Sequence, residues 1–427
     1  MTTAEQGPIA AAGTETESYI IDGDSHVLEP PHLWDEYLER EYRPRAIRIM
    51  RPVEGPDGQP VRPGAHAPDP EPNLPEMAEE VRGRLGSDEA LVVDGQIVMR
   101  GFLAGLGGVE HDRSKLPQMT YLEGAPRASM DTAARLQLFK DWGIHGGVVF
   151  PTIGILWDTE DARLADAYAR AYNRWAYDFV GGHPDQIFPM AHIPLNDPEL
   201  ALTELRRCLK LGFRGMFLAP EPVGPKSEQY PFGDTSPADP VYDPLWHELE
   251  DAGLPVCVHV IVRFNRRVAN NTRVSLLLKG QLSRVHVFGL GATFQIIPAV
   301  SSLVLSGLFD RFPRLKLLAV EAGAGWAAYL MDRLDEKHEM FGYAERTKLA
   351  PSEYLRRNVY YVVEPRERTA NAMMDLVGET QFIWGSDYPH IDSSIDAPHQ
   401  IRASAAGLSE YRRRLLLGEN ARALFGL

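Results

Sequence analysis

Hydrophobic and polar positions follow two alternating patterns over most of this chain. From residue 131 onward, segments with apolar residues every three or four positions alternate with short apolar runs rich in β-branched residues. The clearest helical pattern covers 164–179, where the apolar positions fall on one face. Such an alternation is typical of βα units built around a parallel sheet.

Counting these runs predicts the fold. Strands are expected at 20–27, 146–150, 187–193, 213–218, 255–260, 315–321, 358–363 and 382–386. Helices are expected at 131–142, 164–179, 197–212, 244–253, 298–312, 326–338 and 411–427. Eight βα units predict an α/β fold of the (β/α)8 TIM barrel type, and a doubly wound sheet, which gives similar local patterns, is the alternative.

A long insertion separates the first strand from the second. Prolines are dense from Pro52 to Pro75, which excludes regular helix or a central strand there. Residues 91–99 predict a hairpin around the turn Asp94-Gly95. We predict one domain over 1–427, with 28–130 as an inserted cap or dimerisation segment. For 51–75, a partly disordered loop is the alternative.

Composition excludes several classes of partner. The net charge of −15 over 427 residues argues against nucleic acid or an anionic membrane, because phosphate binding needs a basic surface. No stretch reaches the ~18 apolar residues of a membrane span. Only Cys208 and Cys257 occur, and the first nineteen residues lack the order of a signal peptide, so we expect a cytoplasmic protein without disulfides.

Polar residues at strand ends are the candidates for chemistry, because active sites of such barrels lie at the carboxyl ends of the strands. Asp24 and His26 are two residues apart on the first strand and therefore point the same way. The other candidates at or just after strand ends are His192, His259, Glu321, Asp387 and His390.

Two imidazoles and two carboxylates on one face suit a divalent ion, with Zn²⁺ as first choice and Mn²⁺ as second. Taken singly, His259 is better explained as a hydrogen-bonded core residue, and Asp387 can be explained as a turn residue.

The segment after the fifth strand is basic and aromatic. It includes Arg263 and His286, which we predict to bind an anionic, possibly aromatic, substrate beside the metal. His192 and His390 are further candidates for substrate binding. A solvated loop paired with acidic helices or with a partner subunit is the alternative for this segment.

Four motifs together resemble those of the amidohydrolase superfamily. They are Asp22-Gly23-Asp24-Ser25-His26, His259, the segment 309–316 (FDRFPRLK) and the segment 384–390 (WGSDYPH). The set is most similar to the branch of aminocarboxymuconate-semialdehyde decarboxylase and γ-resorcylate decarboxylase. The resemblance covers most of the chain in motif order, apart from 28–130.

The resemblance implies one catalytic divalent ion in a barrel enzyme. It makes Asp24, His26, His259 and Asp387 the metal ligands, with Asp387 also taking part in proton transfer. It further implies a homodimer. One departure concerns the sixth strand, where the decarboxylases usually have a histidine as base and this chain has Glu321. A buried carboxylate there can act as a base or become an additional ligand.

Three functions remain open from the sequence. The first is a metal-dependent, non-oxidative decarboxylase of a small carboxylated, possibly aromatic, molecule, with Glu321 and Asp387 as catalytic residues. The second is a hydrolase of an amide, ester or carbon–carbon bond that uses metal-bound water with Glu321 as base. The third is a barrel that binds ligands without catalysis.

Overall fold

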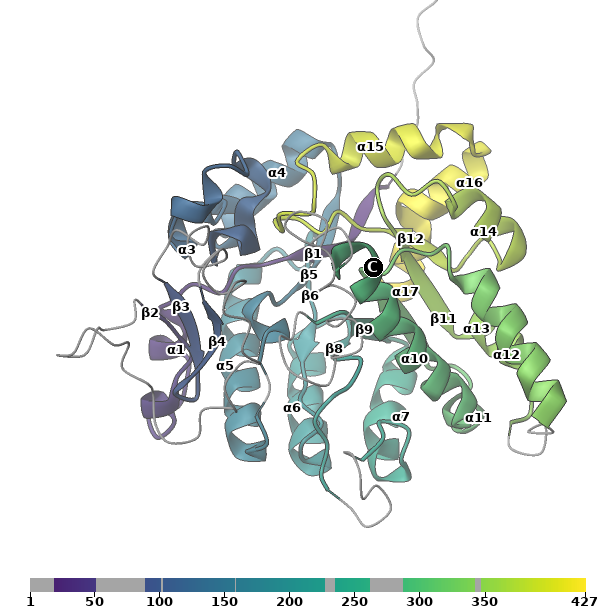
Figure 1. Cartoon of the computed structure of the whole chain (residues 1–427), viewed down its shortest axis with the longest axis horizontal. Helices are drawn as coiled ribbons and strands as arrows, with labels where there is room; N and C mark the ends of the chain where they lie inside the picture. The colour runs from purple at the N-terminus through teal and green to yellow at the C-terminus, as the bar shows by residue number, and fades with distance from the viewer. Residues whose placement is uncertain are drawn as a thin grey trace, which may run out of the picture.

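The computed structural model describes residues 19–50, 89–100, 103–157, 159–226, 235–261, 287–341 and 347–427. Its centre is a parallel barrel (Figure 1). The strands are β1 (Ile21–His26), β5 (Gly146–Phe150), β6 (Ile187–Pro189), β7 (Ala191–His192), β8 (Met216–Leu218), β9 (Pro255–His259), β10 (Lys316–Val320), β11 (Val359–Val363) and β12 (Phe382–Trp384). The eight predicted strand positions are therefore all occupied by strands.

Hydrogen bonds around the ring show that the sheet closes. One series of strands runs β1-β5-β6 and the other runs β7 to β12 in order. The third predicted strand is split at Met190, so that β6 pairs with β5 and β7 pairs with β8. Residues just after β12 close the ring, because Ser25 bridges to Tyr388 and the amide of Asp387 donates to the carbonyl of Asp24 at 2.8 Å. The protein is a (β/α)8 barrel, and a doubly wound sheet is excluded.

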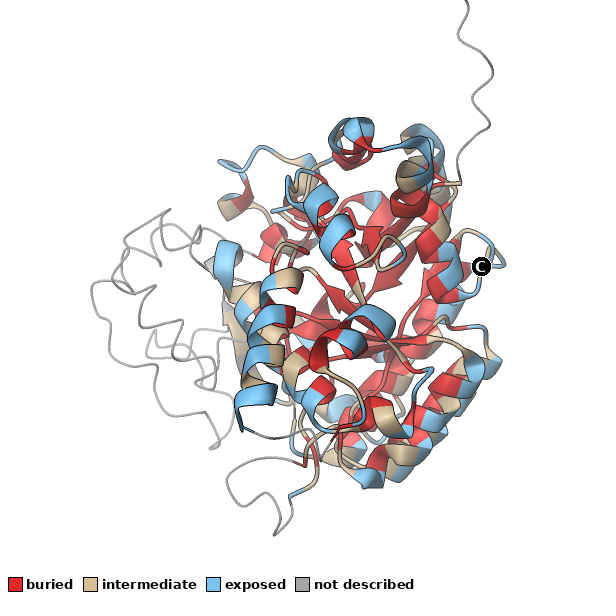
Figure 2. Ribbon diagram, turned by 90° about the vertical axis from the view of Figure 1, so that its right-hand side faces the viewer, coloured by how far each residue is buried: buried red, intermediate tan, exposed pale blue. Residues whose placement is uncertain are grey.

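Helices surround the barrel and turn their buried faces inward (Figure 2). They include α4 (Thr132–Trp142), α5 (Ala162–Val180), α6 (Pro198–Lys210), α7 (Asp243–Ala252), α10 (Ala292–Leu305), α11 (Leu308–Arg311), α12 (Ala327–Phe341), α13 (Pro351–Arg357), α14 (Ala370–Leu376), α15 (Ala397–Ser404), α16 (Glu410–Arg414) and α17 (Asn420–Phe425). Asp131, Asp161 and Asp197 cap α4, α5 and α6 by accepting hydrogen bonds from first-turn amides.

Two predicted boundaries are wrong. The helix expected at 298–312 begins earlier, because Pro298 lies inside α10 rather than at its start, and a separate short helix, α11, follows. Proline favours the first turn of a helix, which made Pro298 look like a start. The strand expected from residue 213 begins at Met216, since Gly215 has a φ of 152° that interrupts regular strand geometry.

The described part of the insertion contains a small antiparallel sheet beside the barrel (Figure 1). It consists of β2 (Arg48–Met50), β3 (Ala90–Val93) and β4 (Gln96–Arg100). The predicted hairpin is confirmed, with Asp94 and Gly95 both at positive φ. Arg45 links this sheet to α5 through ion pairs of 2.6 Å with Asp94 and with Asp161. Residues 51–88 lie outside the described residues, so the role of the insertion as a cap or dimerisation segment stays a prediction.

Close packing at the closure of the barrel leads to a first prediction. A Cβ added at Gly385 would lie 2.3 Å from the Cβ of Asp24, whereas at Gly407 the nearest atom is 3.9 Å away. We expect Gly385→Ala to lower the free energy of unfolding by about 1–3 kcal/mol, and Gly407→Ala to change it by about 0.5 kcal/mol or less. Urea denaturation of both variants measures this. Equal denaturation midpoints would contradict the tight closure.

Candidate active site

The ends of four strands bring five polar side chains together inside the barrel mouth. Nε2 of His26 lies 3.6 Å from Oδ1 of Asp24 and 3.5 Å from Oδ1 of Asp387. Nε2 of His259, at the end of β9, lies 3.7 Å from the same Asp24 oxygen and 3.6 Å from Oε2 of Glu321. Four of these side chains are almost completely buried, and Glu321 is partly exposed. Side chains as far apart in the sequence as Asp24 and Asp387 thus lie in one cluster.

The two imidazoles are oriented by backbone carbonyls. Nδ1 of His26 lies 3.0 Å from the carbonyl oxygen of Pro151, and Nδ1 of His259 lies 2.7 Å from that of Val260. A carbonyl oxygen can only accept, so each Nδ1 carries the proton and each Nε2 presents a lone pair. The two Nε2 atoms face each other at 3.1 Å. Burial, followed by the neighbouring histidines His390 and His259, lowers the pKa of His26 well below its usual range, so the ring stays neutral.

The carboxylates around these rings need a positive partner. Among the described residues, neither Oδ1 of Asp24 nor Oε2 of Glu321 accepts a hydrogen bond, although both atoms are buried. Burial, followed by the charge of Asp387, raises the pKa of Glu321 well above its usual range. Burial also raises the pKa of Asp387, helped by Asp392 and Asp24. Lone pairs and carboxylate oxygens gathered without donors form an arrangement that a cation stabilises.

The spacing of three of these side chains fits the ligands of one divalent ion. Donor atoms bound at ~2.1 Å in a tetrahedron lie roughly 3.4 Å apart, and the distances among the donor atoms of Asp24, His26 and His259 are 3.1–3.7 Å. A second group, within 4.8 Å, shares His26 and adds Glu321, Asp387 and His390. Histidine nitrogens and carboxylate oxygens suit Zn²⁺ and Mn²⁺. The structure thus brings three of the four predicted ligands into one group, and Asp387 meets them at His26.

A second layer of residues holds the first strand against the last. Asp22 accepts hydrogen bonds from the amide of Ser386 at 2.9 Å and from its hydroxyl at 2.5 Å. Burial outweighs these bonds and raises the pKa of Asp22 to about 7. Below the strand, the buried guanidinium of Arg135 donates to the hydroxyl of Ser25 and to the carbonyl of His26. Asp24 and His26 are thus fixed by contacts that the sequence pattern does not reveal.

An unusual backbone conformation orients the carboxylates of Glu321 and Asp387. Glu321 and Asp387 follow β10 and β12, and both have a φ of 55°. Such left-handed conformations are unfavourable for residues other than glycine, asparagine and aspartate, and they concentrate at functional sites. At each position the strand ends in a sharp turn that leaves the carboxylate inside the barrel mouth.

His390 lies against the cluster rather than apart from it. Its Nδ1 is 2.7 Å from Oδ1 of Asp387, its Nε2 is 3.0 Å from the hydroxyl of Thr152, and its ring centroid is 4.0 Å from that of His26. Burial lowers the pKa of His390. In this position His390 orients Asp387, while its predicted role in substrate binding stays a prediction.

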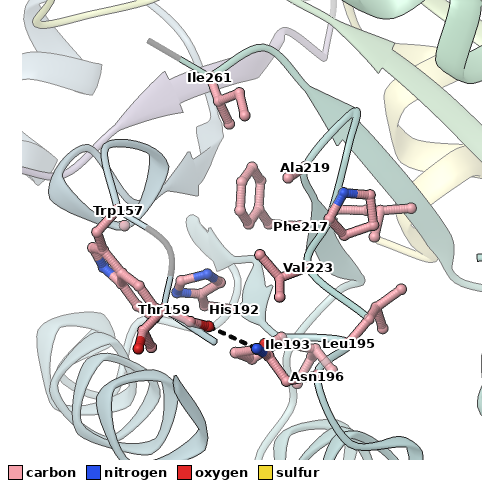
Figure 3. A pocket seen from close by; sticks show the side chains of 14 residues that line it. Trp157, Thr159, His192, Ile193, Leu195, Asn196, Phe217, Ala219, Val223 and Ile261 are labelled. Carbon is pink, nitrogen blue, oxygen red and sulfur yellow. Dashed lines mark hydrogen bonds between the residues drawn. The ribbon is translucent and has the colours of Figure 1, made fainter. Parts of the chain in front are cut away.

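A pocket with aromatic walls adjoins the cluster (Figure 3). The ring of His192 lies between those of Trp157 and Phe217, with centroids 5.1 Å and 5.2 Å away. The ring of Phe217 is also 6.0 Å from that of His259, so one side chain borders both the pocket and the candidate metal ligands. Ile261, directly after β9, adds a further apolar wall. His192 thus lines a small cavity of about 40 Å³ with largely apolar and aromatic walls.

Two predicted substrate-binding residues cannot be placed. Arg263 and His286 lie outside the described residues, as does most of the basic segment between them. Their proposed contact with an anionic substrate stays a prediction.

Sequence reasoning missed three residues near the site. Glu364 directly follows β11, and burial together with Asp24 raises its pKa to about 8. Thr152 follows β5 and contacts His390. Glu29 is buried and accepts hydrogen bonds from the amides of Ile153 and Gly154 at 2.8 Å and 3.0 Å. Glu364 was detectable as a polar residue ending the seventh apolar run, whereas the other two depend on loop geometry.

A barrel of eight parallel strands with an Asp-x-His strand end, facing a histidine and an aspartate from later strands, defines an enzyme of the amidohydrolase type. The chain belongs to the amidohydrolase family, whose model matches residues 156–427. This confirms the resemblance found in the motifs. Among the described residues, no helix is long and apolar enough to cross a membrane.

Individual relatives are more distant. A γ-resorcylate decarboxylase from Rhizobium sp. (strain MTP-10005) is 26% identical over 307 residues, covering 69% of this chain and 86% of that protein. The structure of an amidohydrolase from Mycobacterium avium subsp. paratuberculosis K-10 matches with a TM-score of 0.73 at 21% identity, covering 96% of this chain and all of the other.

A third match carries ligands. It is a dihydroxybenzoic acid decarboxylase from Polaromonas sp. JS666 with bound manganese and the inhibitor 2-nitroresorcinol. The TM-score is 0.59 at 19% identity, with 96% of this chain and 97% of the other covered. At this identity the match shows the fold.

The buried carboxyl of Glu29 allows a prediction about stability and pH. Burial raises its pKa from 4.5 to about 7, so the folded protein holds a proton that the unfolded chain has released between these values. Folding stability therefore falls as pH rises through this window, by up to about 1.4 kcal/mol per pH unit. In Glu29→Gln, we expect the unfolding free energy, measured by urea denaturation at pH 5, 6 and 7, to fall less steeply. Parallel pH profiles for the two proteins would contradict this.

Proposed function

We propose that this protein is a metal-dependent, non-oxidative decarboxylase of a small aromatic carboxylate. The observation that carries the proposal is the pair of imidazole Nε2 atoms that lie 3.1 Å apart between buried carboxylates. Trp157 and Phe217 border a small cavity next to His259, and aromatic walls of this kind favour contact with a flat ring. The similarity to decarboxylases of resorcylate and dihydroxybenzoate supports this choice of substrate class.

Asp24, His26, His259 and Asp387 are the proposed metal ligands. Zn²⁺ was the first choice from the ligand types, but the bound manganese of the Polaromonas neighbour favours Mn²⁺. Two carboxylate oxygens in the set also suit Mn²⁺. When bound, the ion supplies positive charge that attracts the carboxylate or a neighbouring oxygen of the substrate.

Glu321 and Asp387 are the proposed proton carriers. In decarboxylation, the bond between the ring carbon and the carboxylate breaks, CO₂ leaves, and the ring carbon takes up a proton in its place. Burial, followed by the charge of Asp387, raises the pKa of Glu321 well above its usual range, which favours the protonated carboxyl. In that form Glu321 can donate a proton, as an imidazolium would, and recover it from solvent. His390 orients Asp387 and is itself bound to the hydroxyl of Thr152. Arg263, His286 and His192 are proposed to bind the substrate.

A hydrolase is the second candidate. Oε2 of Glu321 lies 3.6 Å from Nε2 of His259, which is a suitable position for a general base acting on water. Release of CO₂ supports the decarboxylase, whereas incorporation of ¹⁸O from labelled water into the product supports the hydrolase. Membership of an enzyme family argues against a barrel that only binds ligands. The homodimer and the cytoplasmic location stay predictions.

Removing the imidazoles tests the metal site. We expect purified protein to contain about one equivalent of Mn²⁺ or Zn²⁺ and the double variant His26→Ala/His259→Ala to contain almost none, because two of four ligands are lost. Elemental analysis after dialysis measures this. His399→Ala is the control, since His399 is an exposed residue on α15 that belongs to no group of possible metal ligands among the described residues. Metal retained by the double variant would disprove the ligand assignment.

Replacing Glu321 tests the proton carrier. With γ-resorcylate as the first substrate tried, we expect Glu321→Gln to lower kcat by about 10²–10⁴ with KM nearly unchanged, because glutamine keeps the shape but carries no exchangeable acid proton. Glu321→His should retain more activity than Glu321→Gln, since imidazolium can donate the same proton. The exposed Glu336 provides the control variant Glu336→Gln. Full activity of Glu321→Gln would exclude this residue as the proton donor.

A further inference from the structure

A short turn after β10 carries Glu321 into the site. Glu321 has a φ of 55° and Gly323 has a φ of 63°, so the chain reverses sharply between them. The hydroxyl of Thr293 donates to the carbonyl of Ala322 at 3.2 Å, and the indole of Trp326 donates to the carbonyl of Gly323 at 2.8 Å. These two bonds satisfy the carbonyls of Ala322 and Gly323. The amides of the next two residues, Ala324 and Gly325, bind a different side chain as their partner.

That partner is the carboxylate of Glu367, from the loop after β11. It accepts hydrogen bonds from the amide of Ala324 at 3.0 Å and from the amide of Gly325 at 2.8 Å. The hydroxyl of Thr369 donates to it at 2.5 Å. Successive amides around a left-handed glycine form a concave site for an anion, and here the anion is a side chain of the same protein.

Glu367 also contacts its own loop. It accepts the amide of Glu364 at 3.3 Å, and Glu364 is the residue that directly follows β11. The carboxylate of Glu367 therefore binds backbone amides after both β10 and β11. The segment after β10 carries Glu321, and the segment after β11 carries Glu364. The fit is close, because a Cβ on Gly325 would lie 2.8 Å from the hydroxyl oxygen of Thr369.

We infer that Glu367 is a positioning residue, which holds the turn so that the carboxylate of Glu321 stays beside His259. The left-handed backbone at Glu321 is unfavourable on its own, so the hydrogen bonds of the turn must maintain it. Loss of the Glu367 carboxylate leaves the amides of Ala324 and Gly325 without an anionic acceptor and releases the turn. The inference rests on the proposed function in one respect, which is that Glu321 acts next to a bound metal ion.

Glu250 provides a matched control at the other end of the same strand. This buried carboxylate on α7 accepts the amide of Arg314 at 2.7 Å, just before β10 begins. Glu250→Gln thus weakens a similar hydrogen bond to a backbone amide, that of Arg314. This amide lies before β10, at the end of the strand opposite to the site. A purely structural role predicts similar behaviour for Glu367→Gln and Glu250→Gln.

The experiment measures Mn²⁺ affinity by calorimetry in the full-length protein. We expect Glu367→Gln to weaken Mn²⁺ binding by about 10-fold, because a displaced Glu321 no longer places its carboxylate oxygen 3.6 Å from Nε2 of the proposed ligand His259. In the Glu321→Gln background, the same substitution should change the affinity by less than about twofold, because its effect passes through Glu321. Glu250→Gln should leave the affinity of the barrel-mouth site within about twofold in both backgrounds. Glu250 itself lies in a separate group with His247 and Asp251, and any ion bound there is fitted as a second site.

Amide hydrogen exchange provides a second readout. The amides of Ala324 and Gly325 should exchange faster in Glu367→Gln and remain protected in Glu250→Gln. If Glu367→Gln does not fold, Thr369→Ala, which removes one bond to the same carboxylate, should show a smaller change in the same direction.

The outcomes separate the two proposals. Equal losses of Mn²⁺ affinity in both backgrounds, or unchanged affinity despite faster exchange, would overturn the positioning role while leaving the metal site intact. Failure of the unaltered protein to bind Mn²⁺ would instead contradict the proposed function, and the inference with it.

Discussion

The closure of the barrel between β1 and the segment after β12 is the contact on which the site depends. The carbonyl of Asp24 accepts the amides of both Ser386 and Asp387, and Asp22 binds the amide and hydroxyl of Ser386. Because these bonds join residues more than 360 positions apart, the first and last candidate ligands occupy fixed places only when the whole ring has formed. Folding of the barrel and assembly of the site are therefore one event.

The same closure places groups together that would not associate on their own. His26 and His259 present lone pairs to each other, and Asp24 adds an oxygen with no hydrogen-bond donor among the described residues. This arrangement costs folding free energy, and a bound cation offsets that cost. Asp22 and Glu29, behind the site, are also buried at a cost in free energy, since burial raises the pKa of each carboxyl to about 7 although hydrogen bonds favour the charged form. The protein retains ionisable groups in its core where hydrophobic residues would pack more favourably.

Much of the architecture was predictable because its signals are local. Apolar runs bounded by helical patterns located the eight strand positions, and the two-residue spacing of Asp24 and His26 placed both on one face. The failures have physical causes. Pro298 suggested a helix start because proline tolerates both the first turn and, with packing, the interior of a helix. Glu367 acts through backbone amides of a neighbouring loop, a tertiary contact that no periodicity encodes.

The left-handed backbone at Glu321 has a consequence for how this family changes its chemistry. The turn holds its shape through main-chain amides and carbonyls, together with Thr293, Trp326 and Glu367, and none of these contacts involves the Glu321 side chain itself. The side chain at this position can therefore be exchanged for another titratable group without rebuilding the loop. A histidine and the present glutamate can occupy the same position on one fixed turn, so that a single substitution changes the acidity at the barrel mouth.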